Sequence, residues 1–263
     1  MTKRAFAIAA HPDDIEFLMA GTLILLGRAG YELHYLTIGN GCCGTAEHTH
    51  DEIVHIRAAE ARAAAVSIGA IYHESLVDDL AIFYERDLLV RVGAMMREVS
   101  PDIVLTHSPV DYMEDHQNAA RLAVTAAFGR GMRNWITDPS RVPVAGAVTV
   151  YHSQPHGNRD PLNHLVRPGI YVDIGSVMDD KRAMLAHHQS QKVWLDQTQG
   201  MDAYLETMLD LSREVGKMSG RFGVAEGWRK RLHLGFCDPN DDPLCAVLSG
   251  HVWVDSQSAG GNL

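Results

Sequence analysis

The chain has 263 residues, of which 46% are hydrophobic, and its formal net charge is −10. This length suffices for one large α/β domain or two small ones. The acidic balance excludes a wide basic surface, so we expect no nucleic-acid partner. No apolar run approaches the ~18 residues of a membrane span, and the first apolar stretch is too short for a signal peptide. The four cysteines show no CxxC spacing. We therefore expect a reduced cytoplasmic protein without a membrane partner.

Strand-like and helix-like segments alternate along the first half of the chain. Strands are predicted at residues 4–10, 32–39, 70–76 and 102–108. Helices are predicted at 15–29, 51–69 and 86–99, and a further one follows His116. This alternation implies right-handed crossovers and therefore a mainly parallel sheet with helices on both faces. The sequence thus predicts a three-layer α/β fold.

The second half continues the pattern less regularly. Further strands are predicted at 147–153 and 170–175, and two helices near 176–189 and 196–217. Proline and glycine cluster at 155–169 and 235–243, which we interpret as loops. No repeat or linker is visible. We therefore expect a single domain over residues 1–263, with helical and loop extensions from about 176 to 263.

Three polar clusters follow predicted strands. They read "HPDD" (11–14), "NGCCGTAEHTH" (40–50) and "HSPVDYMEDH" (107–116). In open α/β sheets ligands bind beyond the carboxyl ends of the strands. We therefore expect the three clusters to converge at one edge of the sheet.

The first and third clusters contain metal-ligand chemistry. His11 and Asp14 are three residues apart, so a helix starting after Pro12 directs both side chains the same way. His116 adds a second imidazole. Two imidazoles, one carboxylate and one open position suit a catalytic zinc or a similar divalent ion, which acidifies water. Asp13 is then free to act as general base.

Two other interpretations of these motifs stay open. An Asp in "HPDD" can be an ordinary helix cap, although capping explains neither the second Asp nor the later Asp115-His116 pair. "GNGCCG" (39–44) matches the dinucleotide fingerprint formally. That fingerprint needs a helix to open at once, and the polar "TAEHTH" follows instead.

"AAHPDD" and "DYMEDH" resemble the LmbE-like, PIG-L-type family of metal-dependent N-deacetylases. The resemblance extends through "IRAAEARAAAVSIGA" (56–70), "VDDL" (77–80), "SPDIVLTHSPVD" (100–111), "KRAMLAHHQSQ" (181–191) and "AEGW" (225–228). It implies a Rossmann-like fold, a zinc ion and hydrolysis of an N-acyl group, commonly the acetyl group of an amino sugar. It also implies assembly as a homo-oligomer, a trimer or a hexamer.

The resemblance also assigns roles to residues. His11, Asp14 and His116 correspond to metal ligands and Asp13 to the general base. Arg57 in "IRAAE" and Asp79 in "VDDL" fall where the family often contacts substrate. A surface ion pair and a loop cap are the alternative roles of these two residues.

One position departs from the family pattern. The family's second motif is His-Pro-Asp-His, whose first histidine stabilises the oxyanion, whereas this chain reads Met113-Glu114-Asp115-His116. Met113 cannot donate a hydrogen bond. Asp115, which would orient the missing imidazole, is present. We expect another histidine to take its place, His188 first, with His107 and His152 as alternatives.

Rival functions remain. A non-catalytic carbohydrate-binding homologue would use the same cleft, and the Met113 substitution favours it. A nicotinamide-dependent oxidoreductase would use "GNGCCG".

Overall fold

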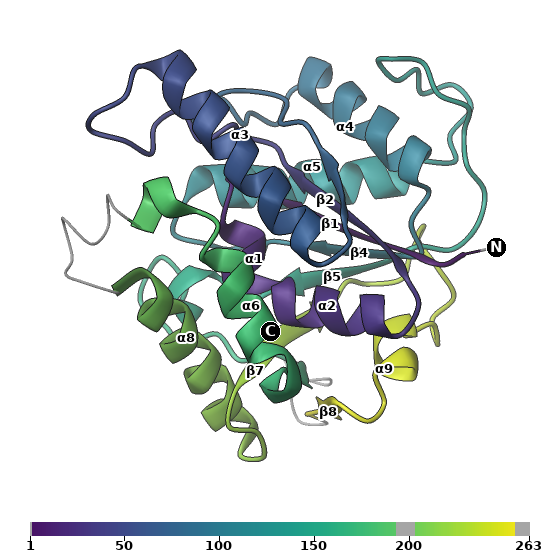
Figure 1. Ribbon diagram of the computed structural model, residues 1–263. Helices are drawn as coiled ribbons and strands as arrows, with labels where there is room; N and C mark the ends of the chain where they lie inside the picture. Colours follow the sequence, from purple (N-terminus) through teal and green to yellow (C-terminus); the bar gives the residue numbers. More distant parts are fainter. Residues whose placement is uncertain (1, 193–202, 256–263) are drawn as a thin grey trace.

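The computed structural model describes residues 2–192 and 203–255 (Figure 1). Within these ranges the strands form one sheet in the order β3-β2-β1-β4-β5-β7-β6-β8. The strands are β1 (Arg4–Ala9), β2 (Glu32–Thr37), β3 (Ile71–His73), β4 (Ile103–Thr106), β5 (Thr149–Ser153), β6 (Ile170–Asp173), β7 (Ala225–Lys230) and β8 (Val252–Val254).

The sheet is mixed, and its two halves differ. Strands β1 to β5 pair in parallel with their neighbours, as the strand–helix alternation predicts. Strand β7 is inserted antiparallel between β5 and β6, and β8 pairs antiparallel with β6. The mainly parallel α/β sheet is confirmed, while β7 and β8 were not predicted.

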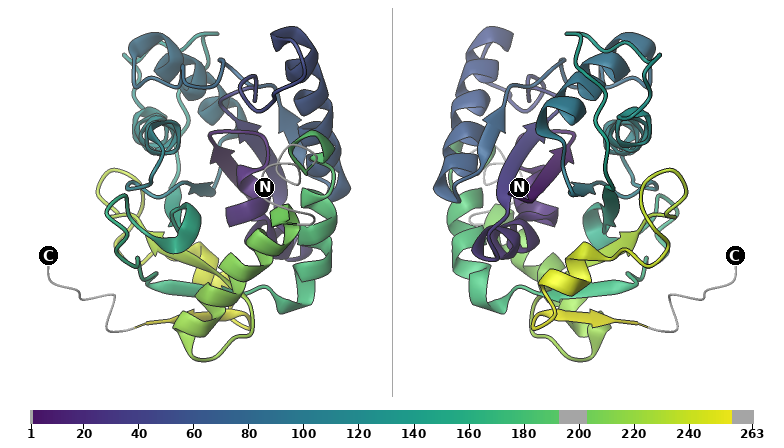
Figure 2. Two further views of the ribbon diagram at one scale, coloured as in Figure 1. Left: turned by 90° about the vertical axis from the view of Figure 1, so that its left-hand side faces the viewer. Right: turned by 90° about the vertical axis from the view of Figure 1, so that its right-hand side faces the viewer.

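Helices cover both faces of the sheet (Figure 2). The α-helices whose bounds lie within the described ranges are α1 (Asp14–Leu18), α2 (Ala20–Arg28), α3 (His50–Ser67), α4 (Arg86–Val99), α5 (Glu114–Gly129), α6 (Met178–Leu185), α8 (Ala203–Ser219) and α9 (Pro243–Val247). Short 3₁₀ turns are η1 (His156–Asn158) and η2 (Gly175–Val177). Helices α4 and α5 lie on one face, and α1, α2, α3 and α6 on the other. Residues 196–202 of the predicted helix 196–217 lie outside the described ranges.

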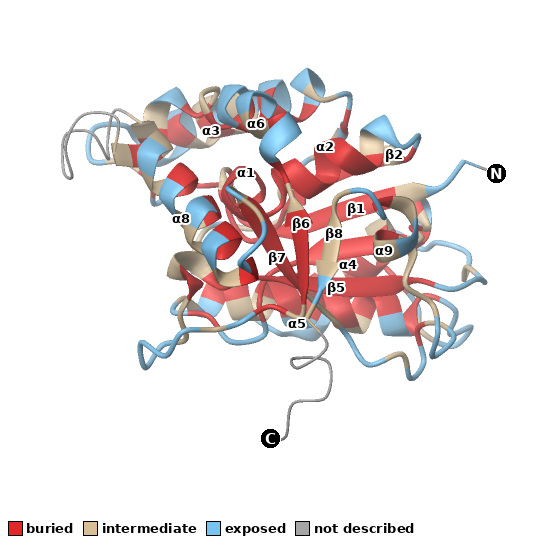
Figure 3. Cartoon of the chain, turned by 90° about the horizontal axis from the view of Figure 1, so that it is seen from below, coloured by how far each residue is buried: buried red, intermediate tan, exposed pale blue. Residues whose placement is uncertain are grey.

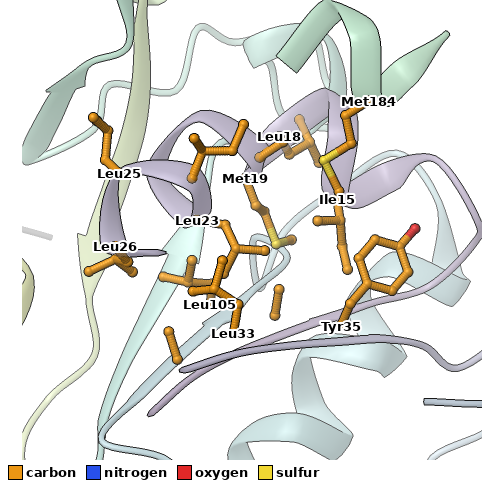
Figure 4. Packing of buried hydrophobic residues seen from close by; sticks show 14 of the residues in the cluster. Ile15, Leu18, Met19, Leu23, Leu25, Leu26, Leu33, Tyr35, Leu105 and Met184 are labelled. Atoms are coloured by element: carbon orange, nitrogen blue, oxygen red, sulfur yellow. The ribbon is translucent and has the colours of Figure 1, made fainter. Parts of the chain in front are cut away.

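Successive side chains of a strand point to opposite faces of the sheet, so one strand contributes residues to the hydrophobic core on each face. Ala5, Ala7 and Ala9 of β1 face the core under α1 and α2, whereas Phe6 and Ile8 face α4 and α5. Figure 3 shows these central strands buried and the outer helix surfaces exposed. On the first face, Figure 4 shows the apolar side chains of α1 and α2 beside a side chain from α6. Those labelled include Ile15, Leu18, Met19, Leu23 and Met184.

The predicted helix 15–29 is divided at Met19, whose φ of −137° is not helical. The division places the N-terminus of α2 against Glu226 of β7. The Glu226 carboxylate accepts hydrogen bonds from the backbone N–H groups of Gly21 (2.8 Å) and Thr22 (2.7 Å). Lys181 of α6 pairs with the same carboxylate at 2.6 Å. A buried ion pair therefore caps this helix and joins the two halves of the sheet.

The described helices include none that is long and apolar enough to pass through a bilayer.

Candidate active site

A cavity of about 470 Å³ opens beyond the carboxyl ends of the parallel strands. All three polar clusters contribute to its wall, as the sheet-edge argument predicts. Carboxylates, imidazoles and aromatic rings line it, among them Asp13, Asp79, His116, His156, Tyr112 and Tyr204.

The turn after β1 has an unusual backbone. Asp13 has φ 107° and ψ −23°, a left-handed conformation that is costly for a residue with a side chain. The turn is held by the His11 backbone N–H, which donates to Asp14 Oδ2 at 2.7 Å. This conformation directs the two adjacent carboxylates to different partners. Asp14 faces the imidazoles, and Asp13 faces Arg57 and Tyr204.

His11, Asp14 and His116 form a buried group of donors whose ligand atoms all lie within 4.8 Å of one another. Asp14 Oδ1 is 3.3 Å from His116 Nε2, and Asp14 Oδ2 is 3.4 Å from His11 Nδ1. The sequence proposed these three residues as a ligand set, and the fold brings them together.

The remaining nitrogen of each imidazole contacts a second carboxylate. His11 Nε2 lies 2.9 Å from Asp115 Oδ2, and His116 Nδ1 lies 2.9 Å from Asp111 Oδ1. Metal-binding histidines usually donate their second N–H to such a group, which orients the ring. The residues present therefore fit a divalent transition metal.

The electrostatics of this group favour a positive charge. Burial lowers the pKa of His11, but hydrogen bonds to Asp115 and Asp14 outweigh burial and raise it to about 9. Burial is likewise outweighed at His116, where Asp14 and Asp111 raise the pKa to about 10. Bound protons or a bound metal cation would each neutralise part of the negative charge that the surrounding carboxylates place on this group.

Asp13 lines the cavity, and one of its two carboxylate oxygens accepts hydrogen bonds. Tyr204 donates its hydroxyl to Asp13 Oδ2 at 2.7 Å, and Arg57 Nη2 is 3.4 Å from the same oxygen. In residues 2–192 and 203–255, nothing hydrogen-bonds to the Oδ1 atom. Burial raises the pKa of Asp13, although the Arg57 charge opposes that rise. Asp13 thus has an oxygen available as a proton acceptor.

Arg57 and Asp79 both line the cavity, and both hold its loops in place. Arg57 donates to the carbonyl oxygens of Pro12 and, at 3.3 Å, of Gly41. Asp79 accepts from the backbone N–H groups of Gly41 (2.7 Å) and Cys43 (3.0 Å). Asp79 thus holds the "GNGCCG" loop (39–44). Because α3 begins only at His50, this loop lacks the adjacent helix N-terminus that a dinucleotide site requires.

Two expectations about the missing motif histidine differ from the structure. Asp115 orients His11 and accepts the Leu80 N–H at 2.7 Å, so its partner is a proposed metal ligand. His188 is completely buried, with Nε2 3.2 Å from Glu16 Oε1, and it does not reach the cavity wall. Both facts follow from tertiary packing that a motif does not contain.

The alternatives His107 and His152 also lie behind the wall. His107 stacks on His116 with ring centroids 4.2 Å apart and accepts the Ala10 N–H at 2.9 Å. His152 is bonded through Nδ1 to the His107 carbonyl oxygen at 2.7 Å. His107, Asp111 and His116 form a second group whose ligand atoms lie within 4.8 Å of one another. The Nε2 atom of His107, however, already accepts the Ala10 backbone N–H.

Sequence reasoning missed several residues of the wall. His156 lies in the region interpreted only as loop, and Gln191 and Tyr204 lie in the less regular C-terminal half. A histidine next to a proline at the end of a predicted strand, in "YHSQPHG" (151–157), was the available signal for His156.

The fold and the site together define an α/β protein with a candidate metal centre at the ends of its parallel strands. The family model described as "PIG-L: GlcNAc-PI de-N-acetylase" matches residues 6–127. The chain is 30% identical over 235 residues to 4-oxalmesaconate hydratase of Pseudomonas putida, covering 86% of this chain and 88% of that protein. It is 28% identical over 236 residues to diacetylchitobiose deacetylase of Thermococcus kodakarensis, with coverages of 86% and 82%.

Solved structures agree with these matches. The structure of GalB, the 4-carboxy-2-hydroxymuconate hydratase of Pseudomonas putida, superposes with a TM-score of 0.72 at 27% identity, covering 92% of this chain and 99% of that one. The fold of N,N'-diacetylchitobiose deacetylase from Pyrococcus horikoshii gives a TM-score of 0.74 at 22% identity, with coverages of 88% and 85%. The chain belongs to the PIG-L (LmbE-like) family. Its relatives include both deacetylases and a hydratase.

Proposed function

We propose that this protein is a divalent-metal-dependent hydrolase, with zinc as the first metal to test, that removes an N-acyl group from an amino sugar. The observation that carries the proposal is the buried His11, Asp14 and His116 set, with a second carboxylate on each imidazole and Asp13 beside it. A divalent ion held there would polarise the amide carbonyl and acidify water.

The protein's own groups account for the proton movements. Asp13 accepts a proton from water as the water oxygen forms a bond to the carbonyl carbon. The C–N bond then breaks, its electron pair stays on nitrogen, and Asp13 returns the proton to that nitrogen. The products are a carboxylic acid and an amine. Tyr204 and Arg57 hold Asp13 Oδ2, which keeps Oδ1 directed at the reacting water.

The cavity supports a neutral sugar as substrate. Its volume of about 470 Å³ is in the range of small-molecule sites, and Phe17, Tyr112 and Tyr204 offer apolar faces. Arg57 is the one Lys or Arg among the described residues of the wall, and its guanidinium already serves two backbone carbonyls. Three aspartates share the same wall: Asp13, Asp14 and Asp79. Substrates with several carboxylates are disfavoured here by charge.

Hydration is a second candidate. The hydratase relative at 30% identity and the loss of the motif histidine at Met113 favour it. Hydration adds water without a leaving group, so it needs no proton for a departing amine. The substrate of the solved hydratase, 4-carboxy-2-hydroxymuconate, carries several carboxylates, and such a molecule fits this cavity less well.

Two assays on one zinc-loaded preparation separate the candidates. We expect release of primary amine from N-acetylglucosamine or N,N'-diacetylchitobiose and no loss of absorbance from 4-carboxy-2-hydroxymuconate. The opposite pair of results would replace hydrolysis by hydration. Bound metal with no turnover of either substrate would favour the carbohydrate-binding homologue.

The Asp13→Asn variant tests the general base. We expect kcat to fall by ~10²–10⁴ while the metal content stays at the wild-type level. Asp87→Asn, on an exposed surface of α4, is the matched control and should keep wild-type kcat. Wild-type turnover in Asp13→Asn would remove Asp13 from the mechanism.

Assembly as a trimer or hexamer stays a prediction.

A further inference from the structure

The cavity contains a histidine that the family motif does not supply. His156 begins the 3₁₀ turn η1, directly after β5 and Pro155, and its ring lines the cavity. In the described ranges no hydrogen bond reaches either ring nitrogen. The imidazole thus presents unused donor capacity to the cavity.

Several other donors on the wall already have hydrogen-bond partners. Arg57 serves two backbone carbonyls, Tyr204 donates to Asp13, and Gln191 Nε2 donates to the Gly44 carbonyl at 2.7 Å. Met113, at the position of the motif histidine, has no donor. A developing oxyanion thus finds no donor at Met113, and the unbonded donors on the described part of the wall include the His156 imidazole and the Tyr112 hydroxyl.

His156 is tied directly to the candidate metal centre. Its backbone N–H donates to Asp111 Oδ2 at 2.9 Å, and Asp111 Oδ1 contacts His116 Nδ1 at 2.9 Å. The fully buried Asp111 carboxylate therefore sets the position of His156 relative to His116. On the opposite side, Asn158 Nδ2 donates to Glu214 Oε2 of α8 at 2.9 Å, which anchors the turn.

Aromatic packing restrains the imidazole ring. Its centroid lies 5.5 Å from that of Phe17 and 5.8 Å from that of Tyr112. Tyr112 in turn contacts the His116 ring, with centroids 5.6 Å apart. A ring held between two others near a candidate reaction centre is pre-organised to donate a hydrogen bond.

We propose that His156 is a catalytic residue that donates a hydrogen bond to the tetrahedral oxyanion formed on the acyl carbon, in place of the histidine lost at Met113. This inference rests on the amide hydrolysis proposed above. It assigns to a loop after β5 a role that the family motif places at the start of α5.

Two substitutions at the same position separate chemistry from packing. His156→Phe keeps a ring between Phe17 and Tyr112 but removes the donor, whereas His156→Gln keeps a donor. We expect kcat on an N-acetyl sugar to fall by ~10²–10³ in His156→Phe, with KM within a few-fold and metal content unchanged. His156→Gln should recover part of kcat. The control is His164→Phe, at an exposed histidine of the same loop, which should behave as wild type.

A binding measurement keeps the test independent of turnover. Methylphosphonate has the tetrahedral shape and the charge of the expected anion. Calorimetry on the zinc-loaded proteins should show at least ~10-fold weaker binding to His156→Phe than to wild type, and a smaller loss for His156→Gln. Equal binding by wild type and His156→Phe would overturn the role of His156, whatever the sugar assay gives. Wild-type protein that turns over no N-acyl sugar would overturn the proposed function alone.

Discussion

The two halves of the sheet contribute different things to one cavity. The parallel half, from β1 to α5, supplies the His11, Asp14 and His116 donors and the carboxylates that orient them. The loop after β5 and the segments that follow it supply much of the surrounding wall, including His156, Gln191 and Tyr204. The comparison teaches that the reactive centre and its surroundings are built separately, so they can be altered separately.

The largest expected effect comes from the reactive centre itself. Asp14→Asn removes the charge that both imidazoles face, so we expect zinc affinity to fall by more than the ~100-fold that loss of a ligand's partner costs. Activity should disappear with the metal. Elemental analysis after dialysis measures the loss. Asp13→Asn, one residue away, is the comparison and should retain metal. Full zinc content in Asp14→Asn would refute the ligand set.

The buried Lys181–Glu226 ion pair should have the next largest effect, which is on the stability of the fold. Lys181→Met leaves Glu226 buried without its cation, so we expect the free energy of unfolding to fall by ~3–5 kcal/mol in urea titrations. The exposed Arg28–Asp180 pair links α2 to α6 nearby and provides the control. Arg28→Met should cost ~0–1 kcal/mol. Similar losses in both variants would show that the buried pair does not join the halves.

Orientation of the ligands should matter less than their presence. Asp115→Asn weakens the contact to His11 Nε2 but still allows an oxygen to accept the Leu80 N–H. We expect zinc affinity to fall by ~10–100-fold. A chelator competition measures it, with the exposed neighbour Glu114→Gln as control. Unchanged affinity in Asp115→Asn would mean that packing alone orients His11.

The smallest effect concerns pH and a pair of histidines away from the cavity. Burial, helped by the charge of His34, lowers the pKa of His73 to about 4 in the folded state. Between about pH 6.5 and 4 the unfolded chain therefore binds the extra proton, so this contribution to stability is lost as pH falls through that window.

His73→Gln cannot titrate and should flatten this acid limb. Urea midpoints at pH 7.5, 6 and 5 should converge more closely in the variant than in the wild type. His164→Gln, at an exposed histidine, should leave the wild-type slope unchanged. A slope that is equally steep in His73→Gln would assign the acid sensitivity to other groups.

Most of the parallel half was predictable from local pattern. Periodicity located β1, β2, β4 and the helices between them, because strands buried on both faces are short apolar runs and the intervening helices repeat apolar residues at helical spacing. The spacing of His11 and Asp14 and the position of His116 after a strand predicted that these three side chains lie together, because parallel strands bring their carboxyl ends to one edge. Strand β7, with Glu226 facing α2, was missed because its pairing depends on segments distant in the chain.

The sequence by itself determined the α/β alternation and the candidate metal donors, since both follow from apolar periodicity and from polar residues placed just after predicted strands. Only the tertiary structure decided which histidine faces the cavity. His188 and His156 both follow strands or helices of the C-terminal half, yet one packs against Glu16 and the other opens onto the wall. The physical reason is that side-chain exposure in a loop depends on long-range contacts, here the Asp111 carboxylate and α8, which no local pattern contains.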